Sequence, residues 1–160
     1  MGEMIKAAAR EQLPVSHPEN PAISGVSIMQ FSGPSAQAGV DRRNTVVVSS
    51  GRFDRDRPST WTGILDRSPC GTGTCAQMAV WHAKGKLGLN QDFVHEGILG
   101  TTFTGRLTGS TMVGRHPAVV PTITGSAYVY AISNYLLDPS DPFPEGFTVG
   151  DIWSVSERDA

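Results

Sequence analysis

The sequence predicts an α+β domain wrapped around one central helix. Two strand-like regions come first, a stretch with a clear helical apolar stripe follows them, and several strand-length runs come after it. The chain has 160 residues, which suits one domain or one large half of a two-domain enzyme, and that length is enough to bury a core.

The N-terminal residues predict a helix over the first dozen positions, because apolar residues recur at helical spacing until Pro14 ends the pattern. These apolar residues are Ile5, Ala8, Ala9 and Leu13. The stretch HPENP at 17–21 predicts a turn, and strands are expected at 26–31 and at the β-branched run 45–48.

A charged excursion runs from Gly51 to Gly63 and continues to the residues around 65. Its charges are of both signs and interspersed, which favours a solvated loop or hairpin. The alternative is a lid over a nearby site, and Trp61 is the feature that favours it.

The central helix is predicted to follow the stretch DRSPCGTGTC at 66–75. Its apolar stripe consists of Ala76, Ala79, Val80, Ala83 and Leu87. Ser68 before Pro69 resembles an N-cap, and Thr72 or Thr74 is the alternative cap. In each case Cys70 lies within one turn of the helix N-terminus.

Four strand-length runs are predicted after the helix, separated by Gly, Pro or Ser. They are Phe93–Leu99, Thr101–Leu107, Ala118–Ile123 and Ala127–Ile132. His95 lies in the first of them, where a structural hydrogen bond is its expected role. The proline-punctuated stretch 138–146 then predicts irregular surface chain.

Composition excludes several classes of protein. The formal net charge of −2 gives no field for binding nucleic acid or an anionic membrane. No stretch is long and apolar enough to span a bilayer, and the charged N-terminus does not match a signal peptide. Two cysteines cannot form a disulfide framework, so we expect a cytoplasmic protein.

Cys70 is the candidate for chemistry. Thiolates are favoured at helix N-termini, where unpaired amides attract negative charge. The following residues, Gly71-Thr72-Gly73-Thr74, offer backbone N–H groups that can hold a carboxylate, and Asp66 could pair with a cation. This combination suits an amino acid as substrate. The alternatives are a small buried hydrophobic cysteine and an aspartate that only orients a turn.

Other motifs are weaker. Gly71 and Gly73 with Ala76 fit the loose dinucleotide-binding pattern, but no strand precedes them. No Gly-Lys-Ser/Thr follows, which excludes a Walker loop. The two cysteines and nearby histidines match no zinc spacing, so no metal site is predicted.

At DRSPCGTGTC (66–75) the sequence resembles the proline racemase family, which includes 4-hydroxyproline 2-epimerases and 3-hydroxyproline dehydratases. The likeness extends to the stretches 11–27, 93–107 and 138–153. The resemblance implies half of a fold like that of diaminopimelate epimerase, in which a curved, mostly antiparallel sheet surrounds a central helix. It also implies a cofactor-independent enzyme.

The resemblance assigns roles to four residues. Cys70 is implied to be one of two cysteines that flank the substrate α-carbon and act as acid and base. Gly71 and Thr72 are implied to donate N–H groups to the substrate carboxylate, and Asp66 is implied to meet the ring nitrogen. Fixed N–H groups aimed at the carboxylate stabilise the negative charge that develops there.

The chain departs from the family because the second cysteine, in a Met-Cys-Gly-His-type motif, is absent. Cys75 cannot replace it, because it lies on the same turn and helix as Cys70 and is expected to pack inward. Residues 1–160 therefore resemble a C-terminal half, with a tail from about 138 packing on the N-terminal half. The expected partners are that missing half or, alternatively, a second copy in a homodimer.

The function expected from the sequence is epimerisation at the α-carbon of hydroxyproline or proline, with the isolated chain inactive. Two alternatives remain open: a 3-hydroxyproline dehydratase, and an amino-acid-binding module without catalysis.

Overall fold

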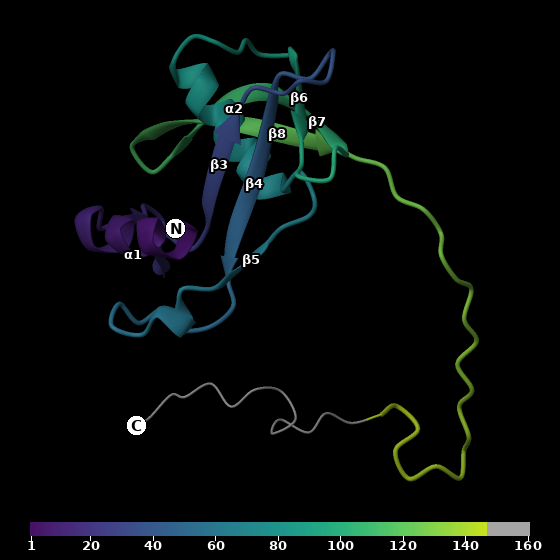
Figure 1. Ribbon diagram of the computed structural model, residues 1–160. Helices are drawn as coiled ribbons and strands as arrows, with labels where there is room; N and C mark the ends of the chain where they lie inside the picture. Colours follow the sequence, from purple (N-terminus) through teal and green to yellow (C-terminus); the bar gives the residue numbers. More distant parts are fainter. Residues whose placement is uncertain (147–160) are drawn as a thin grey trace. The chain divides into compact units, whose positions relative to one another are not determined.

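The computed structural model describes residues 1–146 and has the α+β architecture predicted from the sequence (Figure 1). The chain divides into two units, Met1–Ser126 and Ala127–Ala160. The first unit holds every helix and strand of the described residues. The end of the tail expected to pack on another half, 147–160, lies outside the described residues.

The helices are α1 (Gly2–Gln12), the short 3₁₀ helix η1 (Pro58–Thr60) and α2 (Gly71–Ala83). The strands are β1 (Ser16–His17), β2 (Asn20–Ser24), β3 (Met29–Gly33), β4 (Arg42–Ser49), β5 (Gly63–Leu65), β6 (Asp92–Glu96), β7 (Thr102–Val113) and β8 (His116–Thr124). Neither α1 nor α2, the α-helices of residues 1–146, has the length and apolarity that crossing a membrane requires.

The main sheet has six strands in the order β3-β4-β6-β7-β8, with β5 paired to β4 outside that path. All neighbours are antiparallel except β4 and β6, which are parallel at Arg42–His95 and Arg43–Glu96. The excursion 51–65 returns as β5 and forms a hairpin with β4, as one of the two interpretations predicts. The turn predicted at 17–21 is formed by residues 18 and 19, which join β1 to β2.

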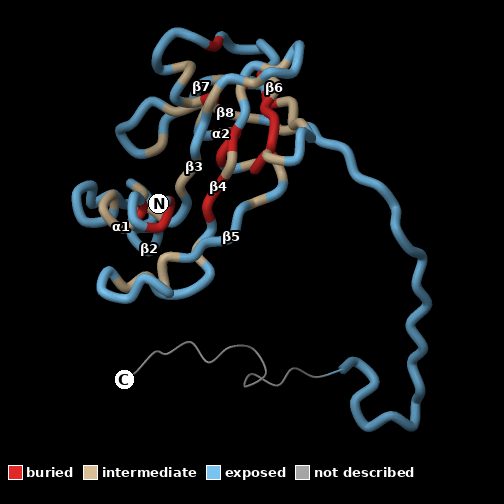
Figure 2. The backbone as a smooth tube through the Cα atoms, in the orientation of Figure 1, coloured by how far each residue is buried: buried red, intermediate tan, exposed pale blue. Residues whose placement is uncertain are grey.

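Helix α2 packs on β7 and β8 to form the core. Its buried members are Met78, Leu87, Phe93 and Leu107. Gly105 in β7 permits this approach, because a Cβ there would lie 2.7 Å from Met78 Cε. Figure 2 shows buried residues on α2, β4 and β6.

The buried face of α2 differs from the predicted stripe. Val80 is exposed, as are Ala76 and Ala83, while Thr74 and Met78 are fully buried. The prediction failed because α2 has small or apolar residues on several faces, so periodicity did not identify the face that meets the sheet. Leu87 is buried as predicted, but it follows the helix.

Helix α1 has the predicted extent, but its buried residues are polar. Ile5 and Leu13 are exposed, whereas Glu3 and Lys6 are 3% and 1% exposed. Lys6 Nζ lies 2.8 Å from Glu3 Oε1, and Ser49 on β4 donates to Glu3 Oε2 at 2.9 Å. Burial by itself raises the pKa of Glu3, but the hydrogen bonds from Lys6 and Ser49 outweigh it and hold that pKa below 4.5.

The hairpin loop is packed by its own side chains. Trp61 stacks on Phe53 with ring centroids 6.5 Å apart, and Trp61 Nε1 donates to Asp54 O. Arg55 forms an ion pair of 2.9 Å with Glu11 on α1. Trp61 therefore packs inside the loop, which accounts for it without the lid interpretation.

The predicted strand Ala127–Ile132 is absent in the described structure, and this prediction was wrong. The apolar residues of 127–137 lie in irregular chain and are highly exposed, with Tyr130 at 95%. A strand forms only when neighbouring strands satisfy its N–H and C=O groups, and none of residues 1–146 pairs with this run. The next stretch, 138–146, is exposed irregular chain as expected.

Three buried polar side chains lie between α2 and the sheet: Asn44 of β4, Thr74 of α2 and His95 of β6, with exposures of 3%, 0% and 0%. Thr74 Oγ1 lies 2.9 Å from His95 Nδ1. Burial, with a smaller contribution from the Arg42 charge, lowers the pKa of His95 from 6.5 to about 4. The ring is therefore neutral at neutral pH.

The buried ion pair leads to a stability prediction. We expect Lys6→Met to reduce the free energy of unfolding by about 3–5 kcal/mol, because it leaves the Glu3 carboxylate buried without its cation. Adding Glu3→Gln to Lys6→Met should recover part of that loss. Urea unfolding of the purified chain measures both. The matched control is Arg55→Met in the exposed pair with Glu11, which should cost less than about 1 kcal/mol.

The buried histidine leads to a pH prediction. Between its ordinary pKa of 6.5 and about pH 4, His95 takes up a proton in the unfolded chain but not in the folded one. The stability that depends on His95 should therefore be complete above pH 6.5 and decline as the pH falls toward about 4. Urea unfolding across this range should show the decline, and His95→Gln should make it shallower, most clearly between pH 6.5 and 5, above the range in which the Glu3 carboxylate titrates. The exposed His116→Gln is the control, and a flat profile for the unmodified chain would contradict the assignment.

Candidate functional site

Cys70 is the N-cap residue of α2. The prediction of Ser68, Thr72 or Thr74 as the cap was wrong. Its backbone has φ 58° and ψ 111°, and Gly73 N donates to Cys70 Sγ at 3.3 Å. A left-handed conformation costs a residue with a side chain roughly 1–2 kcal/mol, and such strain is concentrated at functional sites. The thiol is 7% exposed and lies at the positive end of the helix.

The loop before α2 is fixed by short-range hydrogen bonds. Asp66 Oδ1 accepts from Ser68 N at 2.9 Å, and Ser68 Oγ accepts from Cys70 N at 3.0 Å. Asp66 N donates to Val46 O on β4. Asp66 therefore orients the turn, which is one of the two interpretations of this residue. Ser68, predicted as a possible cap, instead holds the Cys70 amide.

Gly71 and Thr72 are the first two residues of α2. N–H groups at these positions have no acceptor within their own helix and point outward along its axis. The structure thus brings three predicted residues, Cys70, Gly71 and Thr72, to one helix end. A thiol and two amide donors at that end can hold an anion next to a sulfur.

A pocket of about 330 Å³ lies beside this helix end. It is lined by Gly25, Val26, Ser27, Ile28, Gln30, Thr72, Gly73 and Ala76. Gln30 Nε2 donates to Gln77 Oε1 at 3.4 Å, while Gln30 Oε1 is buried and accepts no hydrogen bond within residues 1–146. A Cβ at Gly73 would collide with Gln30 Oε1 and lie 3.3 Å from Cys70 Sγ. Gly73 therefore lets Gln30 approach the cysteine.

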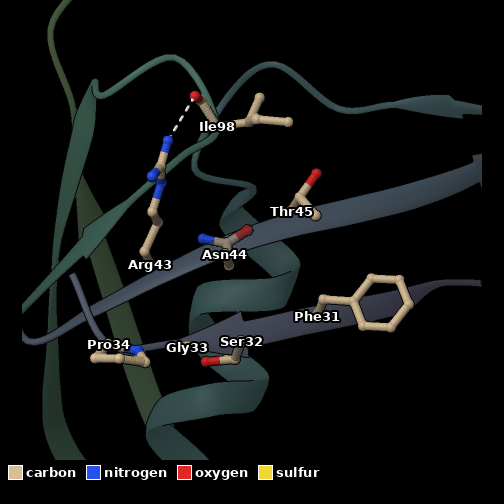
Figure 3. Close-up of a pocket in the computed structure, with 8 residues that line it drawn as sticks. All are labelled: Phe31, Ser32, Gly33, Pro34, Arg43, Asn44, Thr45 and Ile98. Atoms are coloured by element: carbon tan, nitrogen blue, oxygen red, sulfur yellow. Dashed lines mark hydrogen bonds between the residues drawn. The ribbon is translucent and has the colours of Figure 1, made fainter. Parts of the chain in front are cut away.

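A second pocket, of about 420 Å³, lies at β3 and β4 (Figure 3). Its charged residue, Arg43, donates to Ile98 O at 3.1 Å and lies 3.6 Å from Glu96. No sequence-predicted site residue lines it, and it contains no thiol. The N-terminus of α2 has the smaller pocket, but it combines a thiol with backbone N–H donors. It is therefore the better candidate for a catalytic site.

Cys75 has a different environment from Cys70. It is a free thiol that packs against the core cluster. Burial raises its pKa above the ordinary value of 9.0, and the neighbouring Cys70 adds to that effect. This agrees with the prediction that Cys75 packs inward. Among residues 1–146 no cluster of His, Cys, Asp and Glu side chains could hold a metal ion.

Sequence reasoning did not identify Gln30 or Asn44 at this site. Gln30 carries no motif, since it is a single amide in a strand-like run. Asn44 Nδ2 donates to Pro69 O at 3.0 Å, a contact between positions far apart in sequence. Only the tertiary structure shows these contacts.

Comparison with known proteins gives consistent results across sequence and structure. A family-wide sequence profile described as proline racemase matches residues 1–148. The chain is 46% identical over 146 residues to a 4-hydroxyproline 2-epimerase of Streptosporangium roseum, covering 91% of this chain and 40% of that protein. It is 36% identical over 149 residues to a proline racemase of Acetoanaerobium sticklandii, covering 93% and 41%.

A crystal structure of a hydroxyproline epimerase from Agrobacterium vitis, with bound trans-4-hydroxy-L-proline, matches with a TM-score of 0.68 and 35% identity. The match covers 99% of this chain and 42% of that one. The chain thus spans about 40% of the length of the first relative. The fold is the diaminopimelate-epimerase-like one that the resemblance implies, and the chain belongs to the proline racemase family.

Proposed function

We propose that this chain supplies one of the two acid/base thiols of a cofactor-independent epimerase that acts on proline-type amino acids, with 4-hydroxyproline as the preferred substrate. The observation that carries the proposal is the position of Cys70 at the N-cap of α2, with its sulfur on the Gly73 N–H group. The naming of relatives as 4-hydroxyproline 2-epimerases supports this choice of substrate.

In the proposed reaction the Cys70 thiolate takes the α-proton, and a thiol on the opposite face of the substrate gives its proton to the same carbon. The substrate keeps its atoms and its charge, and the two sulfurs exchange protonation states. As the Cα–H bond breaks, negative charge spreads into the carboxylate. Amide donors of Gly71 and Thr72 directed at that carboxylate would stabilise the transition state more than the ground state.

Asp66 is proposed to balance the ammonium of the substrate. One carboxylate oxygen of Asp66 accepts the Ser68 N–H group, which fixes the side chain near the start of α2. Its negative charge, together with the amide donors of Gly71 and Thr72, would orient a zwitterion at the thiol. No separate cofactor is required in this scheme, because fixed dipoles and charges stabilise the developing carbanion.

The second thiol is proposed to come from the part of the enzyme that this chain does not contain. Cys75 is unsuited, because it lies on the same helix as Cys70 and packs against the core. We propose residues 1–160 as the C-terminal half, whose tail from about 138 packs on the N-terminal half. The exposed apolar run at 127–137 supports this, since it gains by burial against another polypeptide.

The test uses a completed enzyme, meaning this chain fused to the N-terminal portion of the Streptosporangium roseum relative. In D₂O, NMR should show α-deuteration and inversion of trans-4-hydroxy-L-proline. Cys70→Ser should reduce the rate at least about 100-fold, because the general base is lost. Cys75→Ser is the matched control and should retain most of the activity.

Two results would contradict the proposal: full exchange by Cys70→Ser, or full turnover by the 160-residue chain alone. Loss of water from 3-hydroxyproline without epimerisation would instead identify a dehydratase. Binding of 4-hydroxyproline without exchange would identify a binding module.

The close approach of Gln30 to Gly73 leads to a further prediction. Gly73→Ala should lower kcat/KM of the completed enzyme and destabilise the chain by about 1–3 kcal/mol, because its methyl group overlaps Gln30 beside the thiol. Gly109→Ala in β7 is the matched control, because a Cβ there meets no atom within 4 Å and the residue lies outside the proposed site. Activity and urea unfolding measure both variants, and equal behaviour of the two would contradict the assignment.

We also propose that the enzyme works in the cytoplasm. Both cysteines are free thiols, and the proposed reaction needs Cys70 reduced. A reducing compartment maintains that state.

A further inference from the structure

The buried polar side chains Asn44, Thr74 and His95 all lie against the backbone that carries the thiol. We propose that these three are positioning residues, which hold the two peptide groups flanking Cys70 so that its sulfur stays at the helix N-cap. This inference rests on the proposed function of Cys70. Asn44 and His95 come from β4 and β6, whereas Thr74 lies in the first turns of α2, so contacts within the helix and across the fold together fix the cysteine.

The conformation of Cys70 requires such support. Its φ of 58° lies in the left-handed region, which residues with a side chain adopt only when their surroundings impose it. The peptide group before Cys70 contains the carbonyl oxygen of Pro69, and the peptide group after it contains the carbonyl oxygen of Cys70. Holding both groups therefore fixes both backbone dihedral angles of this residue.

Both carbonyls receive hydrogen bonds from the cluster. Cys70 O accepts the backbone N–H group of Thr74 at 2.9 Å, and Thr74 Oγ1 adds a second contact to it at 2.7 Å and lies 3.2 Å from Pro69 O. Asn44 Nδ2 donates to Pro69 O at 3.0 Å and to Glu96 O at 3.1 Å. A hydroxyl has one hydrogen and an amide nitrogen has two, so Thr74 serves Cys70 O and Asn44 serves Pro69 O.

His95 completes the cluster. Because the Thr74 hydrogen points to Cys70 O, the 2.9 Å contact between Thr74 Oγ1 and His95 Nδ1 assigns the ring proton to Nδ1, which donates to the hydroxyl. Asn44 Nδ2 is 3.2 and 3.1 Å from the two ring nitrogens, which places the amide against the ring face. The low pKa of His95, about 4, keeps this single-proton arrangement at neutral pH.

The test is Thr74→Val in the completed enzyme, a substitution of similar shape without the hydroxyl. We expect kcat to fall on the order of 10- to 100-fold, because a small displacement of the reacting sulfur is costly. KM should change little, since the amide donors of Gly71 and Thr72 remain. Thr74→Ser should recover most of kcat.

The matched control is Thr45→Val. The Thr45 hydroxyl is likewise buried, but it has no hydrogen-bond partner in the described structure, so kcat should stay unchanged. If Thr74→Val does not fold, the kcat values of Thr74→Ser and Thr74→Ala are compared instead, because these two variants differ only by the hydroxyl oxygen. Ser should then exceed Ala in kcat at least about tenfold.

A second readout is independent of catalysis. In the 160-residue chain with ¹³C-labelled cysteine, the Cα and Cβ shifts of Cys70 report its backbone conformation. Thr74→Val should move them, whereas Thr74→Ser and Thr45→Val should not. Unchanged kcat together with unchanged Cys70 shifts in Thr74→Val would overturn the inference. Exchange that survives Cys70→Ser would overturn only the proposed function, because the shifts still test the positioning.

Discussion

The structure depends on how the chain enters α2. At Cys70 the backbone turns through a left-handed conformation, and the helix begins at the next residue. The Thr74 hydroxyl and the Asn44 amide bind the carbonyls on either side of this turn. Since these groups come from α2 and β4, the start of the helix, the parallel pairing of β4 with β6 and the position of the thiol depend on one another.

Close packing of α2 makes that arrangement possible. Gly105 leaves room for Met78 and the Thr74 methyl group against β7. The polar cluster is thus sealed on one side by apolar contacts, where its hydrogen bonds are not exchanged for bonds to water. The two cysteines of this helix have different environments. Cys70 lies at the N-cap, in the field of the helix dipole, whereas Cys75 packs against side chains of the core.

Much of this was predictable from sequence where the pattern is local. The extent of α1, the position of Cys70 at a helix start and strands β6, β7 and β8 follow from proline positions, glycine positions and β-branched runs. The cap was assigned to Ser68, Thr72 or Thr74, because cysteine is not a common capping residue. The buried Lys6 was not foreseen, because Val47, whose carbonyl oxygen accepts from Lys6 Nζ, is distant in sequence. Tertiary contacts decide such positions, and one sequence does not show them.

The run at 127–137 has a practical consequence for work with this chain. Its tyrosine, valine, isoleucine and leucine side chains are presented to water on a backbone that lacks strand partners in the described structure. Such segments adhere to one another through cross-β contacts. A preparation of the chain by itself should thus become increasingly turbid as it is concentrated.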